Sequence, residues 1–245
     1  MTKYPFTYHH EIGHQGQSLV PHFPGGNSGV TIGPGYDLSL RTPLEVFEDL
    51  TKAGIDHQTA QVLSEAASLS GYEAQKWIYQ HGGIFISEEQ QEFLYNQVLV
   101  PEYEHRMMSQ LQNFVEHHED PQLKMIDFAT LDSRQKEILF DYTYNAGLSR
   151  FPTLVEAVLK EDWVTVSLHS ERFSGDMPLT YRNEMFYQYF LSAESDENFT
   201  SFRESDDTQE ISVLLEDFMN ENTNSDSHLD SNEIDHLLDG SQWEV

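Results

Sequence analysis

The sequence predicts a mainly helical α+β protein with a small β-rich lobe at the amino terminus. Three observations support this class. Residues 1–41 are rich in Gly and Pro and hold only short apolar pieces, which is typical of loops with a small hairpin sheet. From Thr42 onward, apolar residues recur at helical spacing. The chain has 245 residues, of which 38% are hydrophobic, so it is able to bury a substantial core.

Helix-start signals mark three of the predicted helices. Thr42-Pro43-Leu44-Glu45 combines an N-cap, a proline at the first helical position and a capping-box Glu, and this helix should end near Gly54. Ser87-Glu88-Glu89-Gln90 opens a long helix in which Pro101 predicts a kink. Asp132 begins another helix, which Gly147 should end. Apolar spacing predicts further helices over residues 57–69, 72–80, 154–159, 163–168, 183–191, 211–219 and 234–238.

Charge divides the chain into two parts. We expect a main domain over residues 1–195, a polar linker over 196–207 and a small second unit over 208–245. The formal net charge is −29, and residues 194–245 carry 16 acidic side chains and one Arg. Such a chain is poorly suited to bind nucleic acid, because phosphates are bound by Lys and Arg.

Several classes of protein are disfavoured by what the sequence lacks. There is no cysteine, which excludes disulfides, thiolate zinc sites and a cysteine nucleophile. The first residues contain no apolar segment typical of a signal peptide, so we expect no Sec-type export. No run of 18 apolar residues occurs, so we expect no membrane span.

Two carboxylates and a hydroxyl lie on or near the Gly-rich segment 26–38. Glycoside hydrolysis commonly uses two carboxyl groups, one kept protonated by apolar surroundings and one ionised. Glu11 follows several aromatic residues and suits the protonated acid, whereas Asp37 follows a Gly-Pro-Gly turn and suits the ionised role. Thr31 would orient an attacking water. The same pattern is also compatible with surface carboxylates beside ordinary turns.

The segment Ser28-Gly29-Val30-Thr31-Ile32-Gly33-Pro34-Gly35-Tyr36-Asp37-Leu38 resembles a stretch of the lysozyme-type muramidases of glycoside hydrolase family 24. It is more closely similar to the activity domain of pesticin and related effector toxins. In that family a catalytic Glu precedes a Thr and an Asp in such a stretch. Thr31 and Asp37 match these two residues, and Glu11 matches the Glu because it is the only acidic residue upstream.

Two later segments resemble the same family, so that the resemblance covers roughly residues 5–195. Residues 140–147 with Phe151-Pro152 resemble its aromatic-Asn-x-Gly … Phe-Pro helix, and residues 181–186 resemble its closing Arg-rich helix, although one expected Arg is absent. The resemblance implies a lysozyme-like, two-lobed fold. It also implies that Glu11, Thr31 and Asp37 hydrolyse the β-1,4 bond between N-acetylmuramic acid and N-acetylglucosamine without a cofactor. Tyr36 and Asn145 are then expected to bind the substrate, which is peptidoglycan.

A rival interpretation uses the same glutamate. His10-Glu11-Ile12-Gly13-His14 matches the His-Glu-x-x-His pattern, which on a helix binds zinc in metalloproteases. Gly13 and Gly16 weaken the helix that this geometry requires, and no third ligand is evident. A zinc protease is therefore the less favoured alternative.

The acidic tail contains a candidate calcium site. Residues 222–233 fit the twelve-residue loop of an EF-hand between two predicted helices, so we expect an EF-hand-like helix-loop-helix. Asn at position 1 and Ser at position 6 depart from the usual Asp and Gly. A solvated, flexible acidic tail is the alternative. The expected calcium ligands are Asn222, Asn224, Asp226, His228, Asp230 and Glu233.

The sequence together with the resemblance predicts a peptidoglycan hydrolase acting as an antibacterial effector. Without a signal peptide, it would reach the periplasm of target bacteria by a non-Sec route. By analogy with the family, we expect a type VI secretion machine and a cognate immunity protein as partners. A non-catalytic, calcium-dependent wall-binding module is a further alternative.

Overall fold

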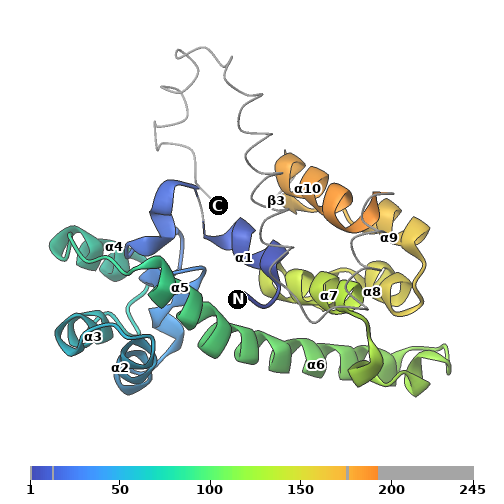
Figure 1. Cartoon of the computed structure of the whole chain (residues 1–245), viewed down its shortest axis with the longest axis horizontal. Helices are drawn as coiled ribbons and strands as arrows, with labels where there is room; N and C mark the ends of the chain where they lie inside the picture. Colours follow the sequence, from blue (N-terminus) through green and yellow to red (C-terminus); the bar gives the residue numbers. More distant parts are fainter. Residues whose placement is uncertain (1, 13, 175–176, 193–245) are drawn as a thin grey trace, which may run out of the picture. The chain divides into compact units, whose positions relative to one another are not determined.

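The computed structural model describes residues 2–12, 14–174 and 177–192. This part of the chain is mainly helical and contains two short two-stranded sheets, as Figure 1 shows. The predicted class, α+β and mainly α, is therefore confirmed. The linker predicted at 196–207 and the second unit at 208–245 lie outside the described residues.

The helices and strands have the following bounds. The longer helices are α1 Pro5–Glu11, α2 Pro43–Lys52, α3 His57–Ser64, α4 Gly71–Gln80, α5 Glu88–Leu94, α6 Val100–His117, α7 Ser133–Asn145, α8 Pro152–Leu159, α9 Trp163–His169 and α10 Thr180–Leu191. Short 3-10 segments occur at His14–Leu19, Leu38–Leu40, Leu123–Met125, Phe128–Thr130 and Leu148–Arg150. The strands are β1 Thr31–Ile32, β2 Tyr36–Asp37, β3 Phe173–Ser174 and β4 Met177–Pro178. β1 pairs with β2 and β3 pairs with β4, both antiparallel.

The helix starts that the sequence predicts are confirmed by their capping contacts. The Thr42 hydroxyl accepts a hydrogen bond from the N–H of Glu45, while the Glu45 carboxylate accepts one from the N–H of Thr42. The same reciprocal arrangement opens α5 at Ser87 and α7 at Asp132. Each capping box satisfies two backbone N–H groups that the first turn of a helix leaves without a partner.

Other predicted boundaries were wrong. Residues 5–11 were expected in a loop-rich segment but form helix α1, in which Phe6, Thr7 and Tyr8 are buried. A helix of seven residues is marginal in isolation, so its packing against α7, rather than local propensity, stabilises it. The hairpin β3–β4 was not predicted, because two-residue strands carry no readable alternation. Helix α3 ends at Ser64 instead of 69, and α10 begins at Thr180 instead of 183.

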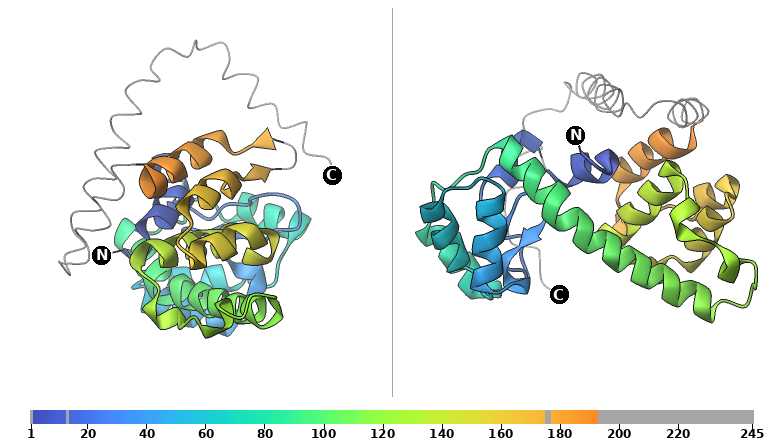
Figure 2. Two further views of the ribbon diagram at one scale, coloured as in Figure 1. Left: turned by 90° about the vertical axis from the view of Figure 1, so that its right-hand side faces the viewer. Right: turned by 60° about the horizontal axis from the view of Figure 1, so that its bottom comes forward.

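A continuous helical segment runs from α5 into α6 through a π-helical turn, Tyr95–Leu99. The N–H of Val100 bonds to the carbonyl of Tyr95, five residues earlier, and Pro101 follows at the start of α6. Figures 1 and 2 show α2–α4 and the β1–β2 hairpin near the α5 end of this segment, and α7–α10 near the other end. None of the described helices is both long enough and apolar enough to cross a membrane.

Helix α1 is anchored in an aromatic core. Tyr4 stacks on Phe140 of α7 with ring centroids 3.9 Å apart, and Phe6 packs edge-on against Phe190 of α10 at 4.9 Å. The N–H of Phe6 also donates to the buried carboxyl of Glu137 at 2.8 Å. These contacts fix the direction of α1 and therefore the position of Glu11 at its end.

Candidate active site

Glu11 is the last residue of α1 and pairs with an arginine from α10. Its carboxylate oxygen Oε1 lies 2.8 Å from Nη1 of Arg182, and 22% of its side chain is exposed. Burial raises the pKa of Glu11 above its ordinary value, while the charge of Arg182 acts in the opposite direction. The net shift is upward, so this carboxyl group holds its proton more firmly than an ordinary glutamate.

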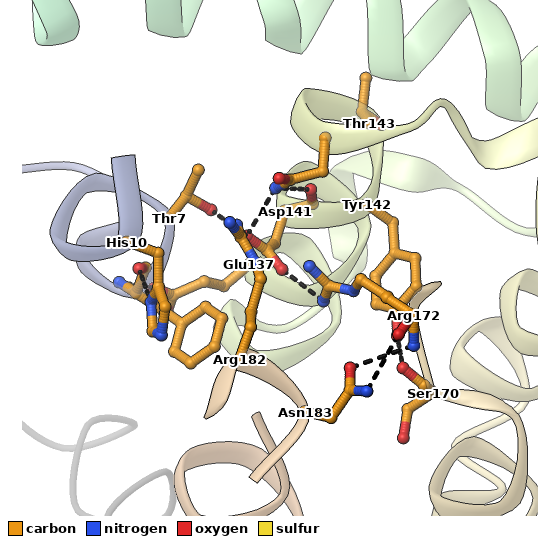
Figure 3. Close-up of polar contacts among 12 residues, drawn as sticks. Thr7, His10, Glu137, Asp141, Tyr142, Thr143, Ser170, Arg172, Arg182 and Asn183 are labelled. Atoms are coloured by element: carbon orange, nitrogen blue, oxygen red, sulfur yellow. Dashed lines mark hydrogen bonds and ion pairs between the residues drawn. The ribbon is translucent and has the colours of Figure 1, made fainter. Parts of the chain in front are cut away.

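The same arginine joins Glu11 to a second, fully buried carboxylate. Nη2 of Arg182 lies 2.6 Å from Asp141 on α7, and Arg172 lies 2.5 Å from the other oxygen of Asp141. The hydroxyl of Thr7 donates to Asp141 at 3.0 Å (Figure 3). Despite burial, the two guanidinium groups lower the pKa of Asp141 to about 2. Asp141 is thus ionised at neutral pH and compensates the charges of Arg172, which is buried, and Arg182, whose side chain is 13% exposed.

The β1–β2 hairpin carries the other two candidate residues. Thr31 and Asp37 are directly opposite each other in the antiparallel pair. Residues in such a register project from the same face of a sheet, so the hydroxyl and the carboxylate are neighbours. The Asp37 carboxylate accepts hydrogen bonds from the N–H groups of Gly29 at 3.2 Å and Ser39 at 2.8 Å. The loop therefore fixes the orientation of this carboxylate.

Gly29 is required for this arrangement. A Cβ atom at this position would lie 2.3 Å from Oδ1 of Asp37 and 2.8 Å from the backbone nitrogen of Ser39. Atoms at such distances overlap, so the absence of a side chain lets the Asp37 carboxylate approach the backbone. This explains one glycine of the segment that resembles the muramidases.

Tyr144 connects the hairpin to the surroundings of Glu11. Its hydroxyl donates to the carbonyl of Pro34, in the turn between β1 and β2. Burial and then the negative charge of Glu11 raise the pKa of Tyr144, which places Glu11 within electrostatic range of the same phenol. The β1–β2 turn is therefore held by a side chain of α7 whose pKa also responds to the charge of Glu11.

The two expected substrate contacts differ in placement. Tyr36 is fully buried, its hydroxyl donates to Asp49 at 2.8 Å, and the Arg41 guanidinium lies 4.2 Å from its ring centroid. Such a side chain stabilises the hairpin and has no surface to offer a ligand, contrary to expectation. Asn145 is exposed at the end of α7, and its amide donates to the carbonyl of Asp141 at 3.0 Å. It is accessible beside the buried carboxylate cluster.

The His-Glu-x-x-His motif does not lie on one helix. Helix α1 ends at Glu11, and a separate 3-10 turn begins at His14. Nδ1 of His10 lies 2.8 Å from the carbonyl of Phe6, so it carries the proton of a neutral imidazole. Burial lowers the pKa of His10 to about 4. Among the described residues, no three His, Asp or Glu side chains form a group that could hold a metal ion.

The expected calcium ligands lie outside the described residues, so their arrangement is not part of the structure. They are Asn222, Asn224, Asp226, His228, Asp230 and Glu233.

Sequence reasoning missed the buried partners of Glu11. Arg182 was placed only in the segment that resembles an Arg-rich helix, while Asp141, Arg172 and Glu137 were not singled out. A signal for Asp141 was present, because an acidic residue between Phe140 and Tyr142 interrupts an apolar helix face. Charged residues in such positions are rarely buried unless they are paired.

The comparisons with known proteins place the chain in a family. The model of a family described as Domain of unknown function (DUF8812) matches residues 5–161, which is more than half of the chain, so the chain belongs to this family. The match includes Glu11, Thr31, Asp37 and Asp141. It ends before Arg172 and Arg182, the two arginines that pair with Asp141. No curated protein matches the sequence.

Proposed function

We propose that the protein is a muramidase that cleaves the β-1,4 bond between N-acetylmuramic acid and N-acetylglucosamine in peptidoglycan. One observation carries this proposal. Helix α1 ends in a partly exposed glutamate, Glu11, whose pKa is raised by burial, while two backbone N–H groups orient the Asp37 carboxylate on the β1–β2 hairpin. A protonated acid near a second, oriented carboxylate is what glycosidic hydrolysis needs. The lysozyme-like, two-lobed description of the fold belongs to the same proposal.

The mechanism assigns one role to each side chain. Glu11 gives its proton to the glycosidic oxygen as the bond between that oxygen and the anomeric carbon breaks. Asp37 either activates a water molecule or supports the oxocarbenium-like transition state. Thr31, beside Asp37 on the same face of the hairpin, holds the water that adds to the anomeric carbon. One proton of this water stays on the new anomeric hydroxyl, and the other returns to Glu11 directly, or passes to Asp37 and is exchanged through solvent.

The test is hydrolysis of purified sacculi, with the released fragments analysed by mass spectrometry. Both substitutions keep the side-chain shape; Glu11→Gln removes the transferable proton and Asp37→Asn removes the negative charge, so each should lower the rate by a factor of about 100 or more. Glu65→Gln changes an exposed carboxylate and serves as the matched control. Cleavage of peptide bonds instead of glycosidic bonds would contradict the proposal. So would wild-type rates in both variants.

For the acidic tail, we propose an EF-hand-like calcium site and delivery as an antibacterial effector that reaches the periplasm of target bacteria, where an immunity protein would oppose it. Calcium should raise the melting temperature of the full chain, and Glu233→Ala should remove this rise. An unchanged melting temperature on calcium titration would contradict the calcium site. If the Glu11→Gln variant killed a sensitive strain as strongly as the wild-type protein does, an effector role based on hydrolysis would be contradicted.

A further inference from the structure

Arg182 forms ion pairs with two carboxylates, one fully buried and one partly exposed. It donates to Glu11 at 2.8 Å through Nη1 and to Asp141 at 2.6 Å through Nη2. The side chain of Asp141 is fully buried, whereas 22% of Glu11 remains exposed. Charges interact more strongly where water is excluded, so the positive charge of Arg182 is more strongly engaged by Asp141 than by Glu11.

The position of Asp141 is fixed by contacts that do not involve Glu11. The guanidinium of Arg172, which pairs with Asp141, lies 3.9 Å from the ring centroid of Tyr142. The side-chain amide of Asn183 accepts from the N–H of Arg172 at 3.0 Å and donates to its carbonyl at 3.1 Å. Figure 3 shows the guanidinium group of Arg172 reaching Asp141 from the right and that of Arg182 from below. A carboxylate held in this way provides a fixed anchor for Arg182.

We propose that Asp141 is a positioning residue that anchors Arg182 and offsets its positive charge, so that the arginine holds the Glu11 carboxyl group in place as a proton donor. The catalytic consequence rests on the proposed function. The effect on Glu11 itself is independent of any substrate.

The other groups around Glu11 do not replace Asp141 in this role. On α7, burial keeps Tyr144 and Glu137 neutral near pH 7, the pKa of Glu137 being raised to about 8. Tyr95 and Tyr103 also feel the charge of Glu11, and burial raises the pKa of both. His10 on α1 is a neutral imidazole. Arg172 and Arg182 favour ionised Glu11, which leaves Asp141 as the negative charge that opposes them.

The test is a carbon-13 NMR titration of the Glu11 carboxyl group, combined with the pH profile of kcat/KM. Asp141→Asn keeps the side-chain shape and removes its charge, so the pKa of Glu11 should fall by about one unit or more. The pH above which kcat/KM declines should fall by the same amount. Asp120→Asn removes a carboxylate that pairs with Lys160 outside the cluster, and it should leave the titration unchanged.

A second variant gives a shift of the opposite sign. Arg172→Gln removes one positive charge and leaves Asp141 to Arg182 alone, so the pKa of Glu11 should rise. This variant also decides the matter if Asp141→Asn fails to fold. An unchanged or raised pKa in folded Asp141→Asn, or an unchanged or lowered pKa in Arg172→Gln, would overturn the inference. The predicted shifts without any hydrolysis of sacculi would support it and refute the muramidase instead.

Discussion

At the scale of single residues, Asp37 depends on the glycine beside it. Two backbone N–H groups orient its carboxylate, and this is possible only because Gly29 has no side chain. The sequence shows the glycine and the aspartate eight residues apart, but not that they touch. A register between two-residue strands is needed to bring them together.

Substitution at this glycine should therefore affect catalysis through Asp37. Gly29→Ala places a methyl group 2.3 Å from the present position of Oδ1, so the carboxylate must move. We expect a loss of kcat/KM comparable to that of Asp37→Asn and a decrease of about 1–3 kcal/mol in the free energy of unfolding. Gly82→Ala is the control, because nothing lies within 4 Å of a Cβ atom there. Equal activity of both variants would refute the role given to Gly29.

Glu137 is a buried acid. Its hydrogen bonds in the described part of the chain come from neutral groups and not from a cation. It accepts the N–H of Phe6, and Tyr189 lies 3.5 Å from its other oxygen. Burial raises the pKa of Glu137 from 4.5 to about 8. The folded protein therefore binds this proton more tightly than the unfolded chain, and the stability that results is complete below pH 4.5 and is lost as the pH rises towards 8.

Removing this titration should flatten the pH dependence of stability. Glu137→Gln retains an acceptor for the N–H of Phe6 but does not titrate, so the stability of the variant should change little with pH. The wild-type protein should lose up to about 1.4 kcal/mol of unfolding free energy per pH unit between pH 4.5 and 8. Urea denaturation at pH 5, 6, 7 and 8 measures the slope for both proteins. The variant should be the more stable of the two at pH 8. Equal slopes for the two proteins would show that Glu137 is already ionised in the fold over this range.

At the scale of elements, Tyr144 couples α7 to the β1–β2 hairpin. Its hydroxyl binds the carbonyl of Pro34, and its ring stacks on Tyr103 of α6 with centroids 4.1 Å apart. A two-residue hairpin has little stability of its own, so contacts of this kind hold it in place. The orientation of Thr31 and Asp37 relative to Glu11 depends on this support.

Loss of the Tyr144 hydroxyl should loosen the hairpin without disturbing the ring contacts. Tyr144→Phe leaves the Pro34 carbonyl without its donor, which should lower the free energy of unfolding by about 1 kcal/mol. We expect kcat/KM on sacculi to fall by about tenfold. Tyr79→Phe is the control, because that residue is 81% exposed. Full activity with reduced stability would mean that the hairpin needs no such support.

Helix starts could be predicted from the sequence, whereas the contacts between elements could not. Thr42, Ser87 and Asp132 each cap a helix through residues three positions away, so the signal is local. The ion pair between Glu11 and Arg182 spans 171 residues and follows from the packing of α1 against α7 and from the contacts of Phe186 and Arg182 of α10 with α7. Helix α1 itself was missed because burial, not propensity, stabilises it.

At the scale of the whole molecule, net charge governs how the protein meets a charged polymer. The chain carries a formal charge of −29. Attraction over long distances cannot bring it to an anionic cell wall, so the proposed binding of peptidoglycan depends on short-range contacts. Dissolved salt screens the repulsion, with a Debye length of about 10 Å at 0.1 M.

Moderate salt should therefore improve activity on sacculi. Raising sodium chloride from about 10 mM to about 150 mM should lower KM and leave kcat nearly unchanged, since the acid chemistry occurs at short range. A short uncharged oligosaccharide is the control substrate, and its KM should not respond. Inhibition by salt on sacculi alone would instead indicate that a local basic surface attracts the wall.

The π-helical turn between α5 and α6 determines the directions in which Tyr95 and Tyr103 project from the helix axis. In a regular α-helix, Tyr95 and Tyr103 would differ by about 80° in direction, because eight residues turn through about 800°. One extra residue in the turn at Tyr95–Leu99 removes about 100° of this rotation. Both rings consequently lie near Tyr144, at 6.2 Å and 4.1 Å. Deleting one residue within this turn would leave a regular helix in which the two tyrosines still project in nearly the same direction, because seven residues turn through about 700°. Deleting one residue between Leu99 and Tyr103 instead would rotate the two side chains apart.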